Sequence, residues 1–258
     1  FQAGDGIRDR DVTGVQTCAL PIFREAETAG RLNHPNIVTM YDAGEEHDLA
    51  YIAMEFLKGK DLAPHVKPDN LLPLPVVLSI VARVADALGY AHKNNVVHRD
   101  IKPANVMYDP ASDSVKVTDF GIARITDSSK TKTGMVLGSP SYMSPEQLSG
   151  KKADGASDMF SLGVTLYQLV SGRLPFTGDS MAQLMFRIAN EAHADIRRHR
   201  ADLPACVAAI VNKTLAKEPE QRYQSCDQLA KALRLCMGSL KIPIKPDRKS
   251  TRLNSSHI

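Results

Sequence analysis

Several features that would assign a sequence to a large class of proteins are missing from this one. The 258 residues carry a formal net charge of only +3, and no block of Lys and Arg forms a polybasic arm. Charge therefore gives no reason to expect a nucleic-acid partner. The four cysteines show neither a Cys-x-x-Cys spacing nor a framework of the secreted kind, which favours a reducing compartment.

Long apolar runs are missing as well. The longest, over residues 71–84, is interrupted by Pro73, Pro75, Ser79 and Arg83. A membrane-spanning helix needs about 18 or more apolar residues, so we expect no membrane segment in this chain. With 43% hydrophobic and 24% charged residues, the composition is that of a globular protein that can bury a sizeable core.

Periodicity divides the chain into a short strand-rich part and a long helical part. Residues 36–42 and 49–56 are rich in β-branched and aromatic side chains and flank a polar turn at residues 44–48, which predicts a hairpin. From residue 75 to 94, apolar side chains recur every three or four positions, as in a helix with one buried face. Similar patterns predict helices over residues 157–170, 181–190, 206–215 and 226–237.

Three short motifs carry the chemistry: HRDIKPAN at residues 98–105, DFG at 119–121 and SPE at 144–146. Any one tripeptide could occur by chance, but the order and spacing of all three agree. The chain resembles the protein kinase family, specifically its bacterial serine/threonine branch, from about residue 23 to about residue 235. The resemblance implies an α+β, two-lobed fold with an incomplete small β lobe and a mainly helical large lobe.

The resemblance also implies a site for phosphoryl transfer. Asp100 is the expected catalytic base, which orients the attacking hydroxyl and accepts its proton. Asn105 and Asp119 are the expected ligands of Mg²⁺ (or Mn²⁺), because a hard cation prefers oxygen atoms. Lys102 is expected to reach the same phosphate as a point charge, and a lysine there resembles the serine/threonine kinases rather than the tyrosine kinases. ATP and the metal ion are the implied cofactors.

Further positions match the adenine site of the family. Met54, Glu55 and Leu57 fall at the end of the second predicted strand, where the resemblance implies the gatekeeper and the hinge that binds adenine. Met107 matches the residue that packs under the adenine ring. For both methionines, an ordinary place in the core is the alternative interpretation.

Four residues match parts of the family that hold the site together. Glu146 and Arg222 match a partly buried ion pair in the helical lobe, with a simple surface pair as the alternative for Arg222. Asp158 matches the carboxylate that fixes the catalytic loop through backbone amides near His98. Removing one partner of a buried ion pair typically costs about 3–5 kcal/mol.

Residues 119–146 correspond to the activation loop of the family. Thr131 and Thr133 align with the pair that bacterial kinases of this type phosphorylate in themselves, which implies self-phosphorylation in trans. Arg99, next to the expected base, offers a guanidinium that a phosphate could engage. A merely solvated Ser/Thr-rich loop is the alternative.

The nucleotide clamp of an active kinase is incomplete in this sequence. Glu25 stands at the position of the helix glutamate that pairs with a strand lysine, with Glu27 as an alternative. The first lysine of the chain, however, is Lys58, and no glycine pattern followed by a strand precedes residue 23. We therefore expect the chain as given to be catalytically impaired.

Both ends of the chain read as translated sequencing adapter. Residues 12–22 reverse-translate without interruption into a common short-read adapter, and residues 247–257 into its complement. We therefore expect residues 1–22 and 247–258 to be artefactual and not to belong to the fold. The remaining expected domains are 23–57 as the remnant of the small lobe, with a helix like the family's C helix and two strands, 58–240 as the large lobe, and 241–246 as the start of the native tail.

Two other functional classes are weighed against a protein kinase. A pseudokinase or scaffold should lack motif residues, whereas all four expected catalytic residues are present. A small-molecule phosphotransferase should lack the segment GSPSYMSPE at residues 138–146, which favours a protein substrate with Ser or Thr. The expected location of the kinase domain is the cytoplasm, and a membrane anchor outside this chain is an open alternative for the parent protein.

Overall fold

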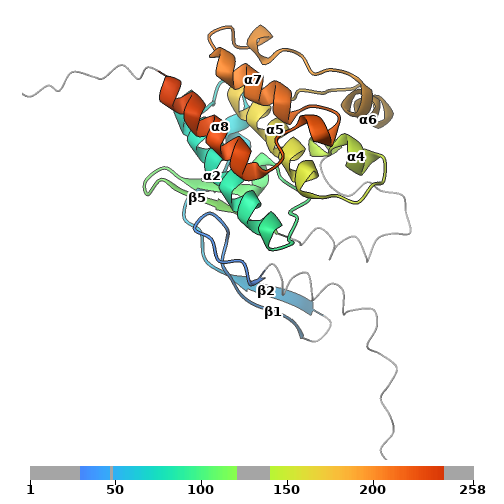
Figure 1. Ribbon diagram of the computed structural model, residues 1–258. Helices are drawn as coiled ribbons and strands as arrows, with labels where there is room; N and C mark the ends of the chain where they lie inside the picture. Colours follow the sequence, from blue (N-terminus) through green and yellow to red (C-terminus); the bar gives the residue numbers. More distant parts are fainter. Residues whose placement is uncertain (1–29, 47–48, 121–139, 241–258) are drawn as a thin grey trace, which may run out of the picture.

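The computed structural model describes residues 30–46, 49–120 and 140–240. A β hairpin lies beside a larger, mainly helical body (Figure 1). The strands are β1 (Met40–Glu46), β2 (Leu49–Met54), β3 (Lys60–Asp61), β4 (Val106–Asp109) and β5 (Ser114–Val117). The α-helices are α2 (Leu74–Lys93), α4 (Pro145–Leu148), α5 (Gly155–Ser171), α6 (Met181–Asn190), α7 (Ala205–Thr214) and α8 (Cys226–Ser239). The 3-10 helices are η1 (Ala63–Val66), η2 (Pro103–Asn105), η3 (Pro140–Tyr142), η4 (Ile196–Arg198) and η5 (Pro219–Gln221). Small antiparallel sheets beside a mainly helical remainder confirm the expected α+β class.

The predicted hairpin is confirmed, but its first strand begins later than expected. β1 and β2 are antiparallel, whereas the residues just before β1 pair with β5 of the helical body. The amide of Val38 donates to the carbonyl oxygen of Val117 at 2.9 Å, and the amide of Val117 donates to that of Asn36 at 2.8 Å. The prediction of a strand from residue 36 is wrong because β-branched composition does not identify the pairing partner.

A second sheet joins β3, β4 and β5 in that order, all antiparallel. Val106 pairs with Val117, and the next pair along is Met107 with Lys116. Because directly opposed residues share a face and successive pairs alternate, the two valines point into the core. Met107 and Lys116 point together to the opposite face.

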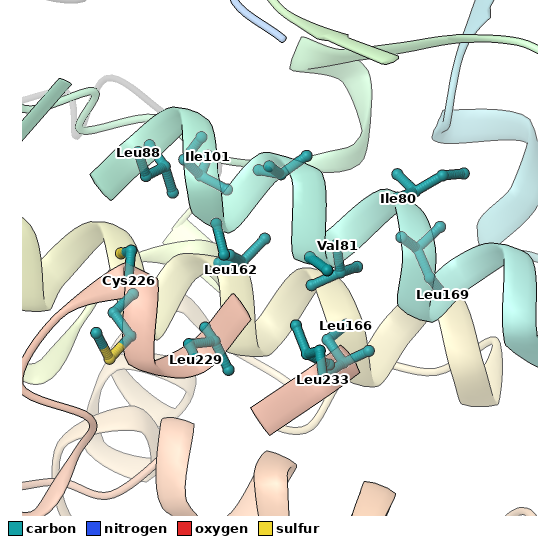
Figure 2. Close-up of a cluster of buried hydrophobic side chains, with 14 of the residues drawn as sticks. Ile80, Val81, Leu88, Ile101, Leu162, Leu166, Leu169, Cys226, Leu229 and Leu233 are labelled. Carbon is teal, nitrogen blue, oxygen red and sulfur yellow. The ribbon is translucent and has the colours of Figure 1, made fainter. Parts of the chain in front are cut away.

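The core of the helical body lies where α2, α5 and α8 meet (Figure 2). The side chains of this cluster are almost fully buried: Ile80, Val81 and Leu88 from α2, Leu162, Leu166 and Leu169 from α5, Leu229 and Leu233 from α8, and Ile101 from the loop after α2. By length and composition alone α2 could cross a membrane, but 61% of its apolar window is buried inside the fold, as in a core helix.

The cysteines differ from expectation. Cys206 and Cys236 form a disulfide between α7 and α8, 30 residues apart in sequence. The sequence indicated no disulfide because isolated cysteines do not reveal which side chains the packing of two helices brings together. Cys226 is a free, buried thiol, and burial raises its pKa far above the ordinary value.

Candidate active site

One buried carboxylate on α5 holds the loop that carries Asp100. Asp158 has no exposed surface. Its Oδ2 accepts the amide of His98 at 2.8 Å and lies 2.8 Å from Nε2 of His92, while its Oδ1 accepts the amide of Arg99 at 2.7 Å. Arg99 has φ 71, a left-handed conformation that is strained for a residue other than glycine. The bonds to Asp158 offset this strain and fix the start of the loop.

Asp100, Lys102 and Asn105 form a compact polar cluster. Nζ of Lys102 lies 2.6 Å from Oδ2 of Asp100, and Nδ2 of Asn105 donates to the same oxygen at 3.1 Å. Nδ2 also donates to the carbonyl oxygen of Asp100 at 2.8 Å. The short helix η2 brings Asn105 back toward Asp100, so residues five positions apart meet. The carboxylate is about one quarter exposed, which leaves it accessible from solvent.

The segment that carries Asp119 is tied to the same loop. The amide of Thr118 donates to the carbonyl oxygen of Asn105 at 3.0 Å, and Nε2 of His98 lies 2.8 Å from the carbonyl oxygen of Thr118. Burial lowers the pKa of His98, so this ring is neutral at physiological pH. Asp119 is exposed and left-handed, with φ 62. The contacts of Thr118 therefore place Asp119 next to the cluster around Asp100.

A buried ion pair joins α4 to the segment after α7. Nη1 of Arg222 lies 2.8 Å from Oε1 of Glu146, and Nη2 lies 3.0 Å from Oε2. Arg222 is only 1% exposed, so the alternative of a surface ion pair does not hold. Burial opposes ionisation of Glu146, but the hydrogen bonds from Arg222 hold its pKa below the ordinary value.

The predicted hinge borders a cavity of about 470 Å³. Glu55, Leu57 and Met107 all line it, so residues separated by about fifty positions in sequence share one wall. Met54 is 38% exposed at the end of β2 and is not among the lining residues. Gly59, with φ 96, lets the chain turn onto β4, because a Cβ there would lie 2.4 Å from the carbonyl oxygen of Tyr108.

Sequence reasoning missed Lys116, which lines the same cavity and lies 2.6 Å from Glu55. The sequence pointed to this position only through the alternation of SVKV in β5, in which the lysine side chain leaves the strand on the face opposite to the two valines. Glu25, Thr131 and Thr133 lie outside the described residues. Within the described ranges, no three His, Cys, Asp or Glu side chains gather closely enough to hold a metal ion by themselves.

A family model described as the protein kinase domain matches residues 10–233. The chain belongs to the protein kinase family. This kinase chain is 40% identical over 207 residues to "Serine/threonine-protein kinase PrkC" of Bacillus subtilis. It is 42% identical over 212 residues to "Serine/threonine-protein kinase PknB" of Mycobacterium leprae, and 41% identical over 213 residues to PknB of Mycobacterium tuberculosis.

These alignments cover 80% of the kinase chain but only 32% to 34% of each relative. The chain thus spans about a third of the length of the curated relatives it matches. The family match begins at residue 10, inside the segment expected to derive from an adapter. The expected domain boundaries and the adapter origin of residues 1–22 and 247–258 stay predictions.

Proposed function

We propose that this kinase transfers the γ-phosphoryl group of ATP to Ser and Thr hydroxyls of proteins. The cluster of Asp100, Lys102 and Asn105 carries the proposal. It places an ammonium and an amide within 3.1 Å of one carboxylate oxygen, on a loop that Asp158 fixes through backbone bonds. Such an arrangement suits a reaction in which positioning and charge stabilisation supply most of the rate.

Asp100 is the proposed base. Lys102 and Asn105 both bind its Oδ2, so they hold the carboxylate in one orientation. The carboxylate can then orient a substrate hydroxyl and accept its proton as the oxygen attacks phosphorus. Lys102 is also the proposed contact of the transferred phosphate, because its side chain is about one fifth exposed and its ammonium lies beside Asp100.

Asn105 and Asp119 are the proposed ligands of Mg²⁺ or Mn²⁺. Both hydrogen bonds described for the Asn105 side chain use Nδ2, which leaves its amide oxygen for a cation. Asp119 adds an exposed carboxylate from the adjoining segment. Two protein oxygens suit Mg²⁺ that completes its shell with water and nucleotide phosphates. When bound with ATP, the ion would neutralise negative charge on those phosphates.

The hinge cavity is the proposed adenine site. Backbone groups of Glu55 and Leu57 would bond the edge of the base, and Met107 would pack under the ring. Met54 remains the proposed gatekeeper at the end of β2. Glu25 is proposed to belong to the clamp on the phosphates, for which the chain offers no lysine before Lys58.

A protein is the proposed substrate rather than a small alcohol. The segment that supports this proposal forms η3 and α4, and Ser144 caps α4 in a capping box with Gln147. We also propose that Thr131 and Thr133 are phosphorylated in trans and that Arg99 binds the phosphate. A cytoplasmic location of the domain, with a membrane anchor elsewhere in the parent protein, belongs to the same proposal.

Transfer of radiolabelled phosphate from ATP to a generic basic protein, compared with small alcohols, tests the function. We expect transfer to Ser and Thr of the protein to be slow, because the phosphate clamp lacks its lysine. Asp100→Asn should abolish the transfer that remains, because it removes the proposed base. Transfer to alcohols alone would support a small-molecule phosphotransferase. A lack of any transfer that depends on Asp100 would contradict this expectation for the chain as given.

A further inference from the structure

Lys116 is the least expected charged residue of the kinase core. It lies in β5 between Val115 and Val117, which are 1% and 0% exposed. The register pairs it with Met107, so both side chains leave the sheet on the face turned toward the hinge cavity. The lysine is only 18% exposed, which requires partners for its ammonium.

Those partners come from two other segments of the chain. Nζ of Lys116 lies 2.6 Å from Oε1 of Glu55 in the hinge and donates to the carbonyl oxygen of Ile37 at 3.1 Å. The same Oε1 accepts the amide of Thr39 at 2.7 Å, and the amide of Glu55 donates back to the carbonyl oxygen of Thr39 at 2.9 Å. One ammonium therefore connects β5, the hinge and the segment that leads into β1.

The environment makes this ion pair more than a surface contact. Glu55 is 21% exposed, so water screens the pair less than it screens pairs on the open surface. Burial opposes the ionised form of Glu55, but the bonds from Lys116 and Thr39 hold its pKa below the ordinary value. Lys116 thus holds the side chain of Glu55, and the hydrogen bond from the Glu55 amide to Thr39 holds its backbone.

We propose that Lys116 is a positioning residue for the nucleotide site, because its ion pair with Glu55 sets the spacing between the hinge and Met107. The inference rests on the proposed adenine site. Lys116 itself does not touch the reacting atoms. It fixes the Glu55 backbone relative to the sheet that carries Met107, and a flat base must fit between these two surfaces.

Binding of radiolabelled adenosine to the full chain by equilibrium dialysis tests the proposal. Lys116→Met keeps the length of the side chain but removes its charge, and we expect it to weaken adenosine binding about five- to tenfold. Glu55→Gln should weaken binding by a similar factor, and the double variant should be hardly weaker than either single one. Lys116→Arg keeps a donor and should stay within about twofold of the wild type.

Lys93→Met is the control, because it removes an ion pair with the same 2.6 Å distance, to Asp227, outside the hinge cavity. This variant should bind adenosine as the wild type does. Equal binding by Lys116→Met and Lys93→Met would overturn the proposal, as would a fully additive double variant.

Amide hydrogen exchange separates this proposal from the proposed function. In Lys116→Met, the amides of Thr39 and Glu55 should exchange about tenfold faster, while amides of α5 remain unchanged. If the wild type bound no adenosine, the proposed adenine site would be wrong. Unchanged exchange at Thr39 and Glu55 in Lys116→Met would instead overturn the role of Lys116.

Discussion

At the scale of single residues, the loop that carries Asp100 depends on a side chain that lies outside it. Asp158 accepts two backbone amides of the loop and contacts His92, and it has no exposed surface. A carboxylate suits this position because it only accepts hydrogen bonds, and all three of its described partners are nitrogen atoms. The start of the loop with Asp100 is therefore fixed by α5.

Asp158→Asn should expose this dependence. The amide group keeps the size of the side chain but turns an NH₂ donor toward amide donors, so we expect a loss of about 2–4 kcal/mol in the free energy of unfolding. Urea unfolding followed by far-UV circular dichroism measures the loss. Asp154→Asn on the same helix is the matched control, because Asn caps a helix as well as Asp does. Equal stability of both variants would contradict the role given to Asp158.

Individual residues of the site also differ in how well the sequence predicts their place. Asp100, Lys102 and Asn105 lie within six positions, and their meeting could be expected from the motif. Lys116 could not be found in this way, because a single lysine in a strand normally indicates an exposed position. Only the register of β4 and β5 reveals that this lysine shares a face with Met107.

At the scale of elements, the helices follow closely from the sequence. The five predicted helices agree with α2, α5, α6, α7 and α8 to within two residues at each end. Their periodicity is local, since apolar residues three and four apart share a face whatever they pack against. Strand pairing is not local, and the residues before β1 pair with β5, about eighty positions away. The disulfide between α7 and α8 was missed for the same reason.

The meeting of α2, α5 and α8 should dominate stability at this scale. Leu166 of α5 is 1% exposed within this cluster, so Leu166→Ala should lower the free energy of unfolding by about 2–5 kcal/mol through lost burial and a cavity. Leu235→Ala on α8 makes the same chemical change at a side chain that is 66% exposed. That control should change stability by no more than about 0.5 kcal/mol. Similar losses in both variants would argue against the core seen in Figure 2.

At the scale of the whole molecule, the buried ion pair joins parts of the helical body that are distant in sequence. Glu146 of α4 is bound by Arg222, and Ser157 of α5 donates to its Oε1 at 2.9 Å. Nη1 of Arg222 also donates to the carbonyl oxygen of Ala156 at 2.8 Å. Through this ion pair, the segment that carries the SPE motif is anchored both to α5 and to the segment between α7 and α8.

The acid dependence of folding follows from this anchor. The pKa of Glu146 is lower in the folded state than its ordinary value of 4.5, so its ionised form stabilises the fold above that pH. This contribution is lost as the pH falls through the folded pKa, when the carboxylate takes up a proton. Unfolding free energies measured in urea from neutral pH to below pH 4.5 should therefore fall more steeply for the wild type than for Glu146→Gln.

Two further variants make this prediction decisive. Glu220→Gln, an exposed carboxylate in η5, should keep the acid dependence of the wild type. Arg222→Met leaves the carboxylate of Glu146 buried without its cation, so it should cost about 3–5 kcal/mol at neutral pH. Protonation of Glu146 removes that unpaired charge, so the gap between Arg222→Met and the wild type should narrow as the pH falls. A gap that stayed constant would show that Arg222 acts through packing alone, for instance against the ring of Phe160, which lies 5.0 Å from its guanidinium.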